Sequence, residues 1–68
     1  MLNTNKLKSY IVGQGMTQGD VAKSLNISPK TFSNKMKKGV FGSDEIEIMI
    51  KLLNIKDPMS VFFAQQVT

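Results

Sequence analysis

Polar side chains that could contact a nucleic acid recur at helical spacing between residues 28 and 38. Lys30, Ser33, Asn34 and Lys37 are separated by intervals of one, three and four residues, and on a helix this spacing places them on one open side. A lysine ammonium can neutralise a phosphate or donate to O6 and N7 of guanine, and an asparagine amide can pair with N6 and N7 of adenine. For Lys30, a phosphate contact and a base contact are both open. For Asn34 the alternative is a solvated or water-bridging amide.

The charges of the chain are unevenly distributed. Nine lysines and five acids give a net charge of +4, and every basic residue is a lysine. No acid lies between Val21 and Ser43, where Lys23, Lys30, Lys35, Lys37 and Lys38 fall. Such a segment gives one end of a small domain a positive field, which attracts polyanions. The alternative is a solvated lysine-rich surface, because a net charge of this size is ordinary for a small domain.

Catalytic and metal-binding side chains are scarce. The 68 residues include no cysteine and no histidine, so thiolate nucleophiles, imidazole bases and the usual zinc ligands are missing. The only acidic cluster, Asp44, Glu45 and Glu47, stands where a helix would begin, and the helix dipole explains it better than catalysis does. We therefore expect no enzymatic activity, no cofactor and no metal.

Length and composition predict one soluble domain. The chain has room for a single small core, and a hydrophobic content of 41% is ordinary for a globular protein. No apolar run approaches the roughly 20 residues that span a bilayer, and no signal-peptide core follows Met1. We expect a cytoplasmic protein with no membrane partner and no small-molecule ligand. The polar tail that ends at Thr68 suits both a complete protein and the first domain of a longer one.

Caps and apolar spacing predict an all-α fold of five short helices. Thr17, Ser28 and Ser43 are typical N-cap residues, and Pro29 suits the first position of a helix. No segment shows the alternation of a strand. The expected helices span residues 5–13, 17–25, 28–38, 43–54 and 58–64.

The segment from Thr17 to Met36 follows the pattern of a helix-turn-helix motif. Its two capped helices are separated by a turn at Asn26, a residue type that tolerates the left-handed backbone conformation. Ala22 is small enough for the second helix to cross close above the first, and Ile27 and Phe32 would fill the angle between them. A plain helical hairpin is the alternative. In DNA-binding motifs of this type the second helix enters the major groove.

The segment GMTQGDVAKSLNISPKTFSNKMKKG resembles the DNA-binding domain of the phage repressor and Cro family, in the lambda-repressor-like superfamily. The resemblance extends over nearly the whole chain, and IEIMIKLLNIKDPMSVFFA looks like the last two helices of small regulators from phages of Gram-positive bacteria. The resemblance implies a compact five-helix domain that regulates transcription as a symmetric homodimer on a palindromic double-stranded operator. Such a dimer would hold its recognition helices about 34 Å apart.

The resemblance also implies roles for single residues. The expected base-contacting residues are Pro29, Lys30, Ser33 and Asn34, at the exposed start and middle of the recognition helix. The expected phosphate-contacting residues are Thr17, Gln18, Ser28, Lys35, Lys37, Lys38 and Ser43. Lys35 departs from the family pattern, since it stands where an apolar core residue is usual. Met36 is therefore the expected partner of Phe32.

Surplus apolar side chains predict a dimer contact near the end of the chain. The expected fourth helix carries two apolar stripes, and the adjacent Phe62 and Phe63 cannot both face one side of a helix. We expect an isologous contact by Met59, one of the two phenylalanines and the end of the fourth helix. The candidate residues are Ile48, Leu52, Met59, Phe62 and Phe63. The alternative is that all of them fill the core of one domain.

A second class of function would use the same apolar surface. A protein-interaction module, such as an antirepressor or the antitoxin of a pair, would bind through the fifth helix and would not need DNA. An RNA-binding domain has less support, because Tyr10, Phe32 and Phe41 are expected to be structural and leave no aromatic side chain for stacking on single strands.

Overall fold

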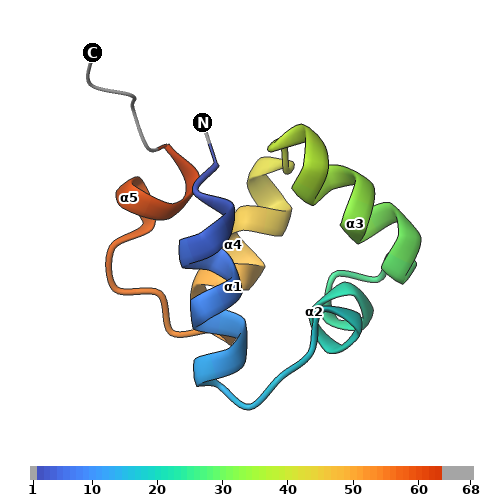
Figure 1. The fold of residues 1–68 in the computed structure, drawn as a ribbon, viewed down its shortest axis with the longest axis horizontal. Coiled ribbons are helices and arrows are strands. Elements are labelled where there is room, and N and C mark those ends of the chain that lie inside the picture. The colour runs from blue at the N-terminus through green and yellow to red at the C-terminus, as the bar shows by residue number, and fades with distance from the viewer. Residues whose placement is uncertain (1, 64–68) are drawn as a thin grey trace.

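Five helices connected by short loops make up residues 2–63, the part of the chain that the computed structural model describes. No strand occurs among these residues, so the expected all-α fold is confirmed. The helices α2 and α3 lie at one side of the molecule, α5 lies at the opposite side, and α1 and α4 lie between them (Figure 1). None of the described helices has the length and apolarity that a membrane span needs. The bounds are α1 (Thr4–Gly13), α2 (Gln18–Ser24), α3 (Pro29–Lys38), α4 (Ser43–Leu52) and α5 (Pro58–Phe62).

The helices α2 and α3 begin at the N-caps that the sequence predicts. Thr17 Oγ1 accepts a hydrogen bond from the N–H of Asp20 at 3.1 Å, and the Asp20 carboxylate accepts one from the N–H of Thr17 at 2.9 Å. Ser28 Oγ accepts from the N–H of Thr31 at 3.1 Å, and Pro29 occupies the first helical position. A cap of this kind stabilises a helix by about 1 kcal/mol.

The start of α4 differs from the expectation. Gly42 is the N-cap, and Ser43 is the first helical residue. The N–H of Gly42 donates to Glu45 Oε1 at 2.8 Å. The prediction of Ser43 as the cap was wrong because a carboxylate in the first turn reaches back to the cap residue and satisfies its N–H group.

Each of the first four helices is followed by a turn of the same type. In each turn one residue has a left-handed backbone, at Gly15, Asn26, Gly39 and Asn54, with φ of 69°, 60°, 71° and 52°. The apolar residue that follows donates its N–H to the carbonyl five residues back, which is the hydrogen bond of a Schellman motif. These bonds measure 3.1 Å at Met16, 3.0 Å at Ile27, 3.2 Å at Val40 and 3.0 Å at Ile55.

The helix α4 ends earlier than expected. Because Asn54 is left-handed, α4 ends at Leu52 and not at residue 54. The last helix is described from Pro58 to Phe62. Its expected end at residue 64 lies outside the described residues.

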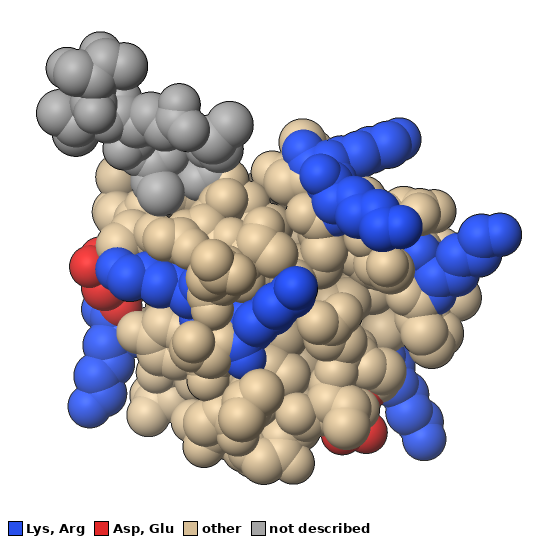
Figure 2. All heavy atoms as spheres, in the orientation of Figure 1, with Lys and Arg blue, Asp and Glu red and all other residues tan. Residues whose placement is uncertain are grey.

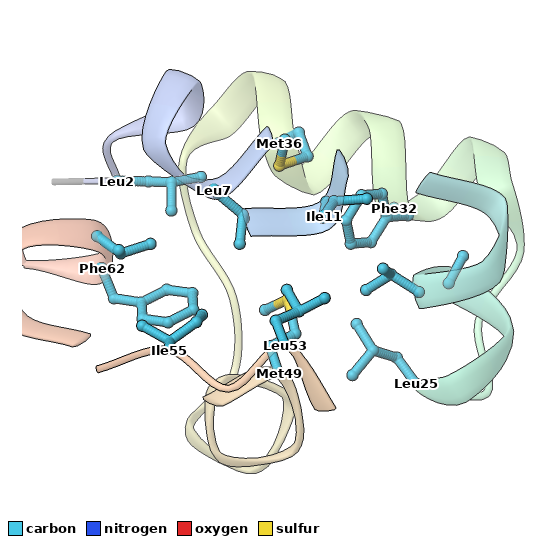
Figure 3. Packing of buried hydrophobic residues seen from close by; sticks show 13 residues of the cluster. Leu2, Leu7, Ile11, Leu25, Phe32, Met36, Met49, Leu53, Ile55 and Phe62 are labelled. Carbon is cyan, nitrogen blue, oxygen red and sulfur yellow. The ribbon is translucent and has the colours of Figure 1, made fainter. Parts of the chain in front are cut away.

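Apolar side chains from all five helical regions meet in one core (Figure 3). Ala22 and Phe32 are 0% and 1% exposed, and α2 and α3 are in contact, as the small residue in α2 predicts. Ile27 is half-buried against the core, and the rings of Phe32 and Phe41 have their centroids 5.5 Å apart. Burial of a phenylalanine stabilises a fold by about 1.5–3 kcal/mol. Phe32 therefore anchors α3 on the core.

Candidate nucleic-acid interface

The helix α3 presents one face to the core and the other to solvent. Phe32 and Met36 are buried and hold the inner face in place. On the outer side lie Pro29, Lys30, Asn34 and Lys37, which are exposed, and Ser33, which is half-buried. The structure thus places all four predicted base-contacting residues on the surface of one helix whose position is fixed by its packing.

Positive charge surrounds this helix. The residues of α3 include four lysines and no acid. Figure 2 shows lysine side chains projecting around the α3 side of the molecule, whereas the acids visible in this view lie at its left and lower edges. The lysines of α3 therefore attract a polyanion that approaches the outer side of this helix, and salt screens that attraction.

Lys35 differs from the other lysines of α3 because it forms an ion pair. Its Nζ lies 2.7 Å from both Oε1 and Oε2 of Glu45. Glu45 is the one charged residue that is buried among residues 2–63, and its side chain is 10% exposed. Because this carboxylate neutralises the ammonium, Lys35 connects α3 to α4 and is less available than its neighbours for the predicted phosphate contact.

The same carboxylate also holds the loop between α3 and α4. Glu45 Oε1 accepts the N–H of Gly42, and Phe41 packs beside the core. Lys38 and Ser43 are exposed on either side of this loop. Both remain candidates for contacts to a phosphate strand.

Among the predicted phosphate-contacting residues at the starts of α2 and α3, two cap a helix and one has an uncommitted side chain. The hydroxyls of Thr17 and Ser28 cap helices, and Ser28 Oγ also lies 2.9 Å from Thr31 Oγ1 in a hydrogen bond. Gln18 is exposed in the first turn of α2 and has no part in the cap. Gln18 is thus the side chain of this group that is free to bind a ligand.

The cap of α2 is charged at neutral pH. The N–H of Thr17, followed by the Thr17 side chain, lowers the pKa of the Asp20 carboxyl below its ordinary value of 3.8. Desolvation opposes this shift, and the charge of Lys23 adds the smallest contribution to it. The α2 start therefore keeps its reciprocal hydrogen bonds throughout the physiological pH range.

A hollow of about 270 Å³ lies where α1, α2 and α3 meet, and sequence reasoning did not identify it. It is lined by Thr4, Lys8, Gln18, Ser33, Met36 and Lys37. Thr4 and Lys8 are one helical turn apart beside the buried Leu7 and Ile11. The spacing of Thr4 and Lys8 shows in the sequence that both lie on the same face of one helix. It does not show that α2 and α3 lie next to this face, so the hollow could not be predicted from it.

The predicted dimer residues divide into exposed and buried ones. Met59, Phe63 and Ile48 are 66%, 50% and 41% exposed. Leu52 is half-buried and packs against the core. Phe62 is 6% exposed and belongs to the core of the monomer, which leaves Phe63 as the phenylalanine available for a contact.

Neither a metal site nor a known relative guides the assignment of function. Within residues 2–63, no three acidic side chains form a group that could hold a metal ion. Comparisons with protein-family models, curated proteins and solved structures give no match for this chain. The function must therefore be inferred from the surface of α3 and its surroundings.

Proposed function

We propose that this protein is a transcriptional regulator that binds double-stranded DNA with sequence preference through α3. The observation that carries the proposal is the outer side of α3, where two ammonium groups, a hydroxyl and an amide lie on a helix without acids. The packing of α2 against α3 and the left-handed turn at Asn26 support a helix-turn-helix of the lambda-repressor-like type.

The chemistry of α3 suits a major groove. Lys30 can donate to O6 or N7 of guanine, and Asn34 can form two hydrogen bonds with adenine. Each such contact discriminates against a wrong base by roughly 1–3 kcal/mol. Lys37 and Lys38 are exposed and can neutralise phosphates, which makes the affinity depend steeply on salt.

Useful affinity requires two copies of the chain. A single domain with about four phosphate contacts binds weakly at cellular salt. The exposed Met59 and Phe63 supply apolar surface for a symmetric homodimer, which would read a palindromic operator. A repressor or Cro-like switch of a phage or prophage, acting in the cytoplasm of the bacterial host, fits this arrangement.

Fluorescence anisotropy with labelled duplexes tests the proposal. Wild-type protein is titrated against random and palindromic duplexes and against single-stranded RNA, from low to physiological salt. Lys30→Ala and Asn34→Ala should lose preference among duplexes more than overall affinity, whereas Lys56→Ala, in the loop before α5, should keep both. Absence of duplex binding by the wild type at low salt would overturn the proposal.

The exposed Met59 and Phe63 favour a second candidate, a protein-interaction module such as an antirepressor or an antitoxin. Such a module would use the region of α5 as its main surface. Sedimentation of a Met59→Ser/Phe63→Ser variant tests the contact, because an unchanged mass would exclude a homodimer at this site. A wild type that self-associates but binds no duplex would support the second candidate.

A further inference from the structure

We propose that α1 takes part in DNA binding, and that the hollow between α1, α2 and α3 receives the sugar-phosphate backbone of duplex DNA. Lys8 of α1 and Lys37 of α3 are the two ammonium groups of this hollow. The inference rests on the proposed function and adds a helix to the DNA-binding surface that neither the α3 face nor the turn includes.

The lining of the hollow suits a phosphodiester backbone. Five of its six residues are polar, and these carry two ammonium groups, two hydroxyls and one amide, with no carboxylate. The sixth is Met36, which is buried. Every charged group of the lining is therefore positive, and the hydroxyls and the amide can donate hydrogen bonds to phosphate oxygens.

The two lysines are available for a ligand. In the described part of the chain the ion-paired lysines are Lys35, with Glu45, and Lys51, with Glu47. Lys8 and Lys37 are exposed and form no such pair among these residues. Their charges are therefore not neutralised by the folded protein.

The hollow is continuous with the outer side of α3. Ser33 and Lys37 belong both to its lining and to the polar side of α3 that we propose to enter the major groove. Because each major groove is bordered by two phosphate strands, a helix seated in the groove brings its flanks close to one of them. The hollow lies along such a flank.

The position of α1 is rigid enough to hold this contact. Leu7 and Ile11 are 0% and 2% exposed and pack in the same core as Phe32 and Met36 (Figure 3). Lys8 follows Leu7 directly, so its backbone is fixed relative to α3. Only the flexible stem of the lysine has to be ordered when DNA binds.

Lys6 provides a matched control for Lys8. Both are exposed lysines of α1, and only Lys8 lines the hollow. Duplex binding of wild type, Lys8→Ala and Lys6→Ala is measured by anisotropy as salt rises from about 50 to about 200 mM. A lost phosphate contact should lower the slope of log affinity against log salt by about 0.9. Over this range the affinity of the wild type should therefore fall about 3.5-fold more than that of Lys8→Ala for each bound copy of the chain, or about 12-fold more for a dimer. The affinity of Lys6→Ala should follow that of the wild type.

The outcomes separate this inference from the proposed function. If the wild type binds duplexes but Lys8→Ala and Lys6→Ala have the same salt slope, the role of α1 is wrong and the proposed function stands. If the wild type binds no duplex at the lowest salt, both are wrong. Circular dichroism verifies that the variants fold, and Lys8→Gln replaces Lys8→Ala if the latter does not.

Discussion

The ammonium of Lys35 lies 2.7 Å from each carboxylate oxygen of Glu45 and thereby connects α3 to the first turn of α4. The two residues are unequal partners, since the side chain of Lys35 is 33% exposed and that of Glu45 is 10% exposed. A nearly buried carboxylate that loses its partner is costly because its desolvation is no longer compensated. Loss of Lys35 should therefore destabilise the fold mainly because it leaves the Glu45 carboxylate desolvated without a counter-charge, and less because the attraction between the two groups is lost.

Replacement of Lys35 by methionine should destabilise the fold by about 1–3 kcal/mol, because Glu45 keeps only the N–H of Gly42 as a partner. The double variant Lys35→Met/Glu45→Gln should regain part of this loss, since no unpaired charge remains. Urea unfolding measures both. Lys37→Met, at an exposed lysine of the same helix, is the control and should change the stability by less than about 0.5 kcal/mol. Equal stabilities of Lys35→Met and Lys37→Met would contradict the structural role of the pair.

Asp20 should make the fold sensitive to acid. Its pKa is lowered below 3.8 in the folded state, chiefly by the N–H of Thr17, so its stabilisation is present above the unfolded value and is lost as pH falls through the folded value. Asp20→Asn should therefore show a smaller drop in melting temperature than the wild type when the pH is lowered through this range. An NMR titration of the Asp20 carboxyl with a midpoint at or above 3.8 would contradict the prediction.

Two adjacent phenylalanines should respond differently to truncation. Phe62 is 6% exposed in the core, so Phe62→Ala should cost about 3–5 kcal/mol in chemical denaturation. Phe63 is 50% exposed, so Phe63→Ala should change monomer stability by less than about 0.5 kcal/mol. If the proposed dimer forms through this surface, Phe63→Ala should also lower the mass measured by sedimentation. A large loss of stability in both variants would show that Phe63 is part of the core.

Asn54 should be replaceable by glycine but not by alanine. Its φ of 52° is a conformation that costs a residue with an ordinary side chain about 1–2 kcal/mol. Asn54→Ala should therefore be less stable than Asn54→Gly by about this amount in thermal unfolding. Asn5→Ala, in the exposed part of α1, should show no such loss, because alanine favours a helix. Equal melting temperatures of the two Asn54 variants would contradict the role of the left-handed turn.

Features that depend on a few neighbouring residues could be predicted from the sequence. The caps at Thr17 and Ser28 involve partners three residues away, and the left-handed turn at Asn26 depends on the preference of one residue type. The small Ala22 and the large Phe32 likewise indicated which sides of α2 and α3 meet. Local chemistry was sufficient in each case.

Features that depend on distant partners could not be predicted. Lys35 and Glu45 are ten residues apart, and nothing in their spacing shows that one would neutralise the other. Whether Phe62 or Phe63 is buried depends on how α5 lies against the rest of the fold. The place of Lys8 in the hollow required the packing of three helices. These side chains acquire their roles only in the assembled tertiary structure.

The chain changes direction through a left-handed residue at four turns, and this residue is glycine in two of them and asparagine in the other two, at Gly15, Asn26, Gly39 and Asn54. The requirement at each position is the sign of a backbone dihedral angle, which glycine and asparagine both satisfy. Evolution can therefore exchange these residues while the path of the chain is conserved. Two descendants of one ancestral chain could keep the same arrangement of helices after their sequences at these turns had ceased to match.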